Sequence, residues 1–496
     1  MPKTILFFTN SDYGQANVVL AAAYELAILA NDVEIHIASF EGLEQAALKT
    51  NQLVVDISPC KPSSRLIFHR LHGRSQFEAC IGPDVDLFKA YDRPPTFFNA
   101  ARTILCIEGI MQPWSSEEFV DLYQQSLHIL SNVKPDLTVI EPLFTPGLTL
   151  CNHLGINWIV LAPNTIKDFA VPLQPRLAAL WKYPIVCSGM PFPLPIYLIP
   201  ANIALNLTLL KNRVGESIQL MTANELGVLK PAPTGLRILV ANSADLDYPF
   251  DILPSHVVPC GPIIRPSLEL SKVDQSLENW LAREPTVYVN LGTHLTMSKS
   301  EAVEMAAAFR QFLDMADAKG RKLQILWKLK IKSVASEDKL VPSSLEQHEE
   351  DVYKAIHRHL GKEMDNDQIR LTNWVTAEPK SVLESGHIIC SVNHGGASSF
   401  NEALCAGVAQ LVLPGWADCY DFANRAELIG IGRWGNKKAK PRWQKDELCE
   451  TLVQVIFGAK AEEINLRAKK FARKYAEGDG RRFAAKVLLD ALVTNL

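Results

Sequence analysis

Residues 390–407, CSVNHGGASSFNEALCAG, place an imidazole, glycines and hydroxyls between an apolar run and a helical pattern. Residues 388–392 (IICSV) predict a strand, and a helix is expected over residues 400–406. The turn at residues 394–399 would then lie at the helix N-terminus, where unpaired N–H groups and a partial positive charge favour an anion. The pattern therefore predicts a site for a phosphate or a similar group.

Each side chain in this turn suits that chemistry. Gly395 and Gly396 let the backbone approach a phosphate without a Cβ in the way. Ser398 and Ser399 can cap the helix and donate to phosphate oxygens, and His394 is a further donor. A capped helix beside a core histidine is the structural alternative, because the turn lacks both the P-loop lysine and the G-x-G-x-x-G spacing.

The first half of the chain alternates strands with helices. Apolar runs with strand character are separated by stretches with helical spacing. Strands separated by helices of about 10–15 residues imply parallel β-α-β units. The runs expected to be strands are KTILFFTN, DVEIHIASF, PDLTVIEPLF and GINWIVLAPN.

A second series of strands and helices begins after a segment rich in turn residues. Residues 1–250 are predicted to form an N-terminal domain, residues 251–270 a linker and residues 271–470 a C-terminal domain. Residues 471–496 are expected to form a helix that packs back on the N-terminal domain. The predicted fold is α/β, with two Rossmann-like doubly wound domains that face each other across a ligand-binding cleft.

Composition is that of an ordinary globular enzyme. The 496-residue chain is 48% hydrophobic and 21% charged with a net charge of −4, which predicts neither nucleic-acid binding nor an acidic tail. Its ten cysteines contain no C-x-x-C pair, which indicates reduced thiols in the cytoplasm. The first apolar run is too short for a secretory signal, and residues 196–210 are too short for a membrane span. A cytoplasmic protein without a membrane span is expected, and no oligomeric state is predicted.

Nine positions between residues 374 and 418 occur in one characteristic order. This order resembles the nucleotide-sugar signature of the UDP-dependent glycosyltransferases of family 1, which have the GT-B fold. The segment WADCYDFANRAELIGIG is most similar to fungal members. The nine residues are Trp374, His394, Gly395, Gly396, Ser399, Glu402, Gly407, Pro414 and Asp418.

The resemblance implies a binding role for each residue near the nucleoside of a UDP-sugar. Trp374 would stack on uracil, the Val375 backbone would read the base edge, and Glu402 would bind the ribose hydroxyls. An indole stack contributes about 1–3 kcal/mol per base, and a carboxylate is a natural double acceptor for a vicinal diol. The structural alternatives are a core position for Trp374, a charge in the first turn of a helix for Glu402 and a turn residue for Asp418.

The same resemblance implies the residues that hold the diphosphate and the sugar. His394, the amides of residues 395–399 and Thr293 would hold the diphosphate, and Asp418 would bind sugar hydroxyls. Preorganised donors stabilise the charge that a departing diphosphate gains, so no metal and no separate cofactor are expected. UDP-glucose is the expected donor, although Cys419, a poor hydrogen-bond partner, occupies the family's second sugar-contacting position.

The residue that would take the acceptor's proton departs from the family pattern. The resemblance implies inversion at the anomeric carbon, with a histidine base where this chain has Gln15 and an acidic partner at Glu141. A glutamine amide is not a useful base near neutral pH. Three candidates then remain: Glu141 as base or orienting residue, Asp12 in the same loop as Gln15, and His69, which has His72 nearby. The structural alternatives are a helix cap for Asp12 and a packing or surface role for either histidine.

Residues 91–114 and 170–215 are rich in proline and aromatic side chains. They are expected to line an apolar pocket for a small hydrophobic acceptor, such as a phenolic or other secondary metabolite. Core packing beneath long loops is the alternative for each of these residues.

Three functions are compatible with these features. The leading hypothesis is a UDP-sugar-dependent transferase that acts on a hydrophobic small molecule. A weak or silent UDP-sugar-binding auxiliary protein would keep the donor site and lack the base. A UDP-sugar epimerase or hydrolase of the same fold is the third hypothesis.

Overall fold

The computed structural model describes residues 2–30, 32–57, 66–81, 86–209, 235–332, 342–475 and 478–494. Residues 210–215 of the expected acceptor region lie outside these ranges. The chain divides into two compact units. Unit 1 comprises Met1–Ala90, Thr96–Pro266 and Tyr475–Leu496, and unit 2 comprises Tyr91–Pro95 and Ser267–Lys474.

Unit 1 is built on a parallel sheet with the strand order β3-β2-β1-β4-β5-β6-β7. Successive side chains of a strand point to opposite faces, so Ile5 and Phe7 of β1 pack on one side of the sheet and Leu6 and Phe8 on the other. The strands are β1 (Lys3–Phe8), β2 (Val33–Phe40), β3 (Leu66–Leu71), β4 (Leu137–Ile140), β5 (Trp158–Ala162), β6 (Ile238–Val240) and β7 (Val257–Pro259).

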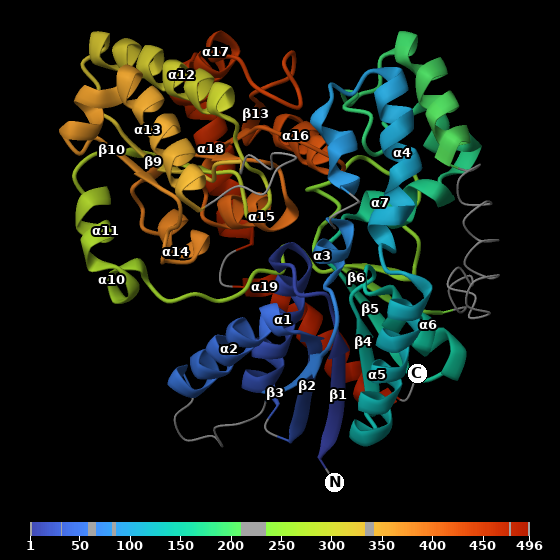
Figure 1. The fold of residues 1–496 in the computed structure, drawn as a ribbon. Coiled ribbons are helices and arrows are strands. Elements are labelled where there is room, and N and C mark those ends of the chain that lie inside the picture. The colour runs from blue at the N-terminus through green and yellow to red at the C-terminus, as the bar shows by residue number, and fades with distance from the viewer. Residues whose placement is uncertain are drawn as a thin grey trace. The chain divides into compact units, whose positions relative to one another are not determined.

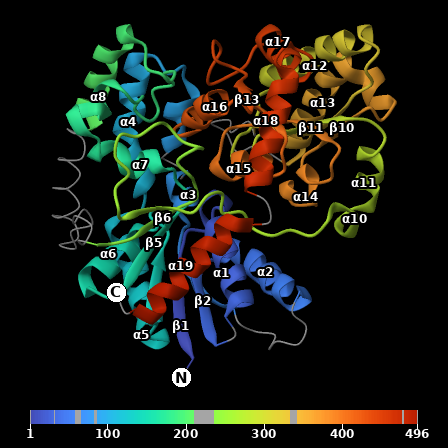
Figure 2. The ribbon, with the colours of Figure 1, turned by 180° about the vertical axis from the view of Figure 1, so that it is seen from behind.

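Helices cover both faces of this sheet (Figure 1). The Ile5 face packs on α1, α2 and α19, and the Leu6 face packs on α5, α6 and α7. Figure 2 shows α19 beside α1. The helices of unit 1 are α1 (Tyr13–Leu29), η1 (Glu41–Leu43), α2 (Glu44–Ile57), α3 (Gln76–Cys80), η2 (Leu87–Asp92), α4 (Phe97–Met111), α5 (Ser116–Val133), α6 (Thr145–Leu154), α7 (Ile166–Ala170), η3 (Val171–Leu173), η4 (Pro175–Leu177), α8 (Ala178–Trp181), η5 (Ile196–Leu198) and α19 (Asp479–Thr494).

An ion-pair cluster fixes the last helix on unit 1. Glu25 of α1 is 3% exposed and accepts hydrogen bonds from Arg481 Nε at 2.9 Å and Arg482 Nε at 3.1 Å. A buried carboxylate needs such partners, because desolvation of an unpaired charge costs several kcal/mol. The C-terminal helix is therefore held by a specific contact as well as by apolar packing.

Unit 2 is built on a second parallel sheet, with the strand order β10-β9-β8-β11-β12-β13. Its central strands β8 and β12 are buried along their whole length, which is typical of parallel sheets covered on both faces. The strands are β8 (Thr286–Asn290), β9 (Gln324–Lys328), β10 (Ile369–Thr372), β11 (Ile388–Asn393), β12 (Ala409–Val412) and β13 (Gly432–Trp434).

The helix of the expected anion-binding turn starts earlier than the sequence predicts. It begins at Ala397, three residues before the predicted start at Phe400. No helix in the described ranges combines the length and apolar character needed to cross a membrane. The helices of unit 2 are α10 (Leu270–Val273), α11 (Gln275–Leu281), α12 (Lys299–Ala318), α13 (Pro342–Asp365), α14 (Pro379–Leu383), α15 (Ala397–Cys405), α16 (Cys419–Leu428), α17 (Lys445–Ile456) and α18 (Ala461–Lys474).

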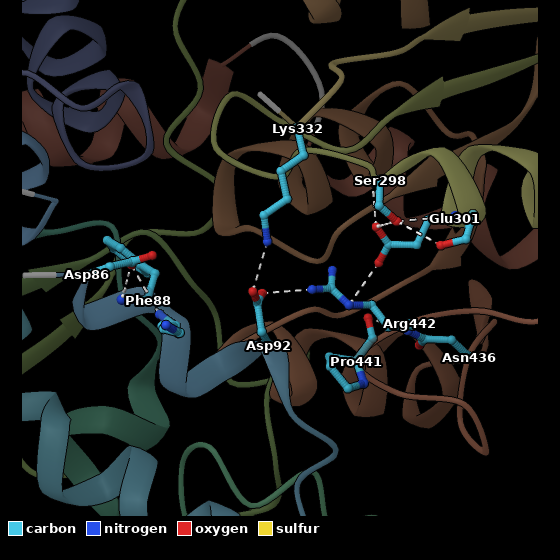
Figure 3. A network of polar contacts seen from close by, with 11 residues as sticks. Asp86, Phe88, Asp92, Ser298, Glu301, Lys332, Asn436, Pro441 and Arg442 are labelled. Atoms are coloured by element: carbon cyan, nitrogen blue, oxygen red, sulfur yellow. Dashed lines mark hydrogen bonds and ion pairs between the residues drawn. The ribbon is translucent and has the colours of Figure 1, made fainter. Parts of the chain in front are cut away.

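A short segment from the first half of the chain, Tyr91–Pro95, belongs to unit 2. Its Asp92 accepts from Lys332 Nζ at 3.0 Å and from Arg442 at 2.7 Å (Figure 3). Arg442 also pairs with Glu301 of α12 at 2.8 Å. One carboxylate thus receives two cations from residues 240 and 350 positions away in the sequence, which anchors the segment on unit 2.

Candidate functional site

Five strands of unit 2 carry polar or aromatic side chains at their carboxyl ends. Parallel strands run in one direction, so their carboxyl ends meet at the same edge of the sheet. That edge therefore brings together four residues that the sequence predicts for the site, and one residue that it does not. The residues at or after the ends of β8, β9, β10, β11 and β12 are Thr293, Lys328, Trp374, His394 and Asp418.

The imidazole of His394 is wedged between two glycines. A Cβ at Gly396 would lie 2.4 Å from His394 Nε2, and a Cβ at Gly292 would lie 2.7 Å from Cε1. Burial lowers the pKa of His394 to about 4, and the nearby His294 and Lys328 add to this effect. The ring is thus neutral near pH 7. Its Nδ1 is buried and has no hydrogen-bond partner among the described residues.

The turn after His394 follows a conformation that glycine favours. Gly395 has φ +80°, and a Cβ there would lie 2.8 Å from the Cys419 carbonyl oxygen. Its N–H donates to Asn393 Oδ1 at 2.9 Å. The side chain of Cys419 is only 1% exposed, so the thiol at the family's second sugar-contacting position packs in the protein interior.

Helix α15 begins directly after this turn without a side-chain cap. Gly396 is the N-cap residue, and no side chain makes the capping hydrogen bond. Ser398 and Ser399 lie inside the first turn, so the prediction that they cap the helix is wrong. Their hydroxyls remain at the mouth of the helix together with the first-turn amides.

Trp374 forms an exposed platform at the end of β10. Its side chain is 59% exposed, and its backbone is fixed by Thr372, whose Oγ1 donates to the Trp374 carbonyl oxygen at 2.6 Å. The Lys328 ammonium lies 4.4 Å from the centroid of the indole ring. A hollow of about 490 Å³ adjoins Trp374 and Val375 on the side of α11 and α13, and its lining does not include His394 or Glu402.

Two carboxylates complete the edge. Glu402 lies on α15, partly buried, and its charge contributes to the raised pKa of Tyr288, which is caused chiefly by burial. Asp418 occupies the N-cap position of α16 and is partly buried, without a capping hydrogen bond from its side chain. Glu402 therefore lies close to the β11–α15 turn, and Asp418 lies on the loop after β12.

Unit 1 holds a separate polar network around Glu141, which follows β4. Asn10 Nδ2 donates to Glu141 Oε2 at 3.3 Å and to Gln76 Oε1 at 3.1 Å. Gln15 Nε2 donates to the same Gln76 oxygen at 2.8 Å. Glu141 and Gln15 are thus linked through Asn10 and Gln76, without a direct bond between them.

A backbone carbonyl sets the orientation of these amides. Gln76 Nε2 donates to the Ile110 carbonyl oxygen at 2.8 Å, and a carbonyl can only accept. The Gln76 oxygen must then receive the NH₂ groups of both Asn10 and Gln15. This leaves Asn10 Oδ1 and Gln15 Oε1 as buried acceptors without a partner among the described residues.

The carboxyl group of Glu141 is 0% exposed. Burial raises its pKa to about 8, hydrogen bonds from Leu143 and Asn10 act against that shift, and the charge of Asp12 adds to it. Glu141 is therefore neutral near pH 7 and does not contact solvent. Asp12, by contrast, is partly exposed at the N-cap position of α1, next to Gln15.

Curated proteins that resemble this chain are glycosyltransferases. No protein-family model matches the sequence. The chain is 33% identical over 447 residues to glycosyltransferase sdnJ of Sordaria araneosa, across 88% of this chain and 84% of that protein. It is 25% identical over 249 residues to a UDP-glycosyltransferase of Talaromyces amestolkiae, across 49% of this chain and 44% of that protein. The chain belongs to the UDP-dependent glycosyltransferases.

The fold agrees with this family. The solved structure of UDP-glucose: anthocyanidin 3-O-glucosyltransferase in complex with UDP superposes with a TM-score of 0.62 at 15% identity, over 100% of this chain and 99% of that chain. The two parallel-sheet units of this glycosyltransferase are therefore those of the GT-B fold, as the sequence predicts.

His69 of the glycosyltransferase lies outside the Gln15 network. It is on β3, and its Nε2 lies 2.7 Å from His36 Nδ1 of β2, with the two rings stacked at 5.0 Å. The pKa of each histidine is lowered, mainly by burial, which favours neutral rings that share one hydrogen bond. This arrangement fits the packing alternative for His69. The backbone N–H and carbonyl of His72 form hydrogen bonds with the side-chain amide of Gln125.

Several residues of these sites could not be recognised from the sequence. Asn10 and Gln76 belong to the network only through tertiary contacts, 66 residues apart. A usable signal existed for Lys328, because it lies at the end of the apolar run LQILWKL, and ligands bind at the carboxyl ends of strands in open α/β sheets. His294 likewise follows β8, which ends at Asn290.

Substitution of Gly396 tests the histidine wedge. Gly396→Ala is expected to lower the midpoint of thermal unfolding, because the new Cβ would overlap the His394 ring and overpacking costs about 1–3 kcal/mol. Gly14→Ala is the matched control, since a Cβ there meets nothing within 4 Å. Combining Gly396→Ala with His394→Gly should restore the midpoint to that of His394→Gly alone. Equal midpoints for Gly396→Ala and wild type would contradict the wedge.

Proposed function

We propose that this glycosyltransferase transfers glucose, with inversion, from UDP-glucose to a hydroxyl group of a small hydrophobic molecule. The observation that carries the donor half of the proposal is the wedged His394 with its unpartnered Nδ1, on the same sheet edge as the exposed indole of Trp374. A flat nucleobase needs a stacking surface, and a diphosphate needs hydrogen-bond donors, such as an imidazole N–H and backbone amides. The two features supply both.

The donor assignment follows from the chemistry of each position. Uracil stacks on Trp374, and the backbone of Val375 reads its edge. Glu402 accepts hydrogen bonds from the ribose hydroxyls. The diphosphate lies against the first turn of α15, where the missing side-chain cap leaves the amides for an anion.

The sugar lies beside Asp418 and Thr293 in this proposal. Asp418 is partly buried on the loop before α16, and Thr293 is exposed after β8. A carboxylate that accepts from sugar hydroxyls fixes the orientation of the anomeric carbon. The buried thiol of Cys419 contributes no such contact, so the choice of glucose depends on Asp418.

Exposed apolar side chains of unit 1 support a hydrophobic acceptor. Phe98 of α4 is 75% exposed and Tyr197 of η5 is 79% exposed, both within the regions expected to line the acceptor site. Tyr183, in the same regions, is 1% exposed and packs with Tyr248 and Phe192. The acceptor therefore contacts only part of these regions, and Tyr183 belongs to the core.

Asp12 is the proposed proton acceptor. Its carboxylate is partly exposed, whereas Glu141 is buried and neutral near pH 7. The acceptor hydroxyl donates its hydrogen bond to Asp12 and loses its proton there, and its oxygen forms a bond to the anomeric carbon as the bond to UDP breaks. Gln15 positions the acceptor beside Asp12. Glu141 then orients Asn10 and, through Gln76, Gln15.

Product analysis tests the proposed activity directly. Incubation with UDP-glucose and a library of phenols and alcohols is expected to give UDP and a product heavier than its acceptor by one hexosyl group, detected by mass spectrometry. UDP release without an acceptor would instead indicate a hydrolase, and a new UDP-sugar epimer by NMR would indicate an epimerase. Binding of UDP-glucose without turnover would indicate an auxiliary protein.

Loss of the donor contacts should weaken UDP binding. Trp374→Ala removes a stack worth about 1–3 kcal/mol and is expected to reduce UDP affinity about tenfold, measured by calorimetry. His394→Ala should reduce it as well, because a donor to the diphosphate is lost. Unchanged affinity in both variants would contradict the donor assignment, and Trp181→Ala, an exposed indole of unit 1, is the control.

Turnover of unit 1 variants should separate the base from the orienting residues. Asp12→Asn is expected to lower kcat about 100-fold or more, the usual contribution of a positioned base. Glu141→Ala should lower kcat more than Gln15→Ala does, since it also removes the hydrogen-bond partner of Asn10. All three variants should leave UDP affinity unchanged. A kcat for Asp12→Asn within twofold of wild type, or the reverse order for Glu141 and Gln15, would contradict these roles.

A further inference from the structure

Lys328 ends β9 among the residues assigned to the UDP-sugar donor. Its Nζ lies 4.4 Å from the centroid of Trp374 and donates to the Gly292 carbonyl oxygen at 3.3 Å. Its charge also contributes to the lowered pKa of His394. The ammonium of Lys328 is thus close to the indole proposed to stack on uracil, to the loop that carries Thr293 and to the ring of His394.

Among the residues that the structure describes, no acidic side chain forms an ion pair with this ammonium. Lys328 is partly buried, and its pKa is lowered first by that burial and then by the neighbouring Lys330. Lys330 donates to the Thr293 carbonyl oxygen at 2.8 Å, so a second cation contacts the loop that carries Thr293. Partly desolvated cations are normally paired with an anion, because burial of an unpaired charge is unfavourable.

We propose that Lys328 binds the diphosphate of the UDP-sugar and stabilises the charge that UDP gains as it leaves. The inference rests on the donor assignment proposed above, and it adds a cation that the nine-residue signature does not contain. The ammonium has three N–H groups. One bonds Gly292, and the other two are available to phosphate oxygens, which form stronger bonds with a charged donor than with a neutral one.

A purely structural role for Lys328 makes a different prediction. If the ammonium only supported the indole, its loss would disturb stacking of the base and would weaken every uridine ligand equally. If it binds the diphosphate, its loss weakens only ligands that carry phosphates. A comparison of uridine with UDP therefore separates the two roles.

The experiment measures binding of uridine, UMP and UDP to full-length protein by calorimetry, for wild type, Lys328→Met and Lys328→Arg. Lys328→Met keeps the apolar stem and removes the charge. It is expected to weaken UDP about tenfold or more, the magnitude of a hydrogen bond to a charged group, and to leave uridine within twofold. Lys328→Arg should recover most of the UDP affinity. Lys330→Met is the matched control, because its ammonium is exposed, and it should change UDP affinity less than threefold.

Two results would overturn the role of Lys328: an equal loss for uridine and UDP, or unchanged UDP affinity in Lys328→Met. Wild-type protein that binds no UDP would contradict the donor assignment itself. The unchanged binding of uridine shows that a variant is folded, so a loss confined to UDP cannot arise from unfolding.

Discussion

The proposed donor site depends on one steric constraint, the fit of the His394 ring between Gly292 and Gly396. These glycines come from the ends of two adjacent strands, β8 and β11, and any Cβ at either position would overlap the imidazole. The ring in turn lies against the turn that opens α15. Because the wedge joins the loop after β8 to the mouth of the helix, amides, hydroxyls and imidazole reach the same edge of the sheet.

A comparable constraint orders unit 1. The carbonyl of Ile110 can only accept a hydrogen bond, and this single fact fixes the direction of the Gln76 amide and then those of Asn10 and Gln15. Two buried oxygens are left as acceptors, which suits a ligand that brings a hydroxyl group. Where the resemblance implies a histidine, this chain has the oriented amide of Gln15, and the neighbouring Asp12 is the proposed proton acceptor.

Much of the backbone that carries the proposed donor residues could be predicted from the sequence because its determinants are local. Apolar runs predict the strands, and the glycines after β11 predict a close backbone turn. The sequence predicts the start of α15 three residues too late. Ala397, Ser398 and Ser399 directly follow two glycines, so the pattern assigns them to the turn, whereas their backbone is helical. The thiol of Cys419 is buried by packing that no local pattern reveals.

Other features depend on contacts between distant residues and could not be predicted. Asp92 anchors its segment on unit 2 through a residue 350 positions away, and the sequence assigned it to the first domain. His69 contacts His36 diagonally across the β2–β3 pair, where the register partner of His69 is Ala38. Gln76 enters the network from 61 residues beyond Gln15.

A crystal structure of the protein with UDP is the most direct test of the central claim. The account predicts electron density for the diphosphate against the amides at the start of α15 and within hydrogen-bond distance of Lys328, with uracil flat on Trp374. Density for the nucleotide at another place, or a site filled by the protein's own side chains at saturating UDP, would contradict it.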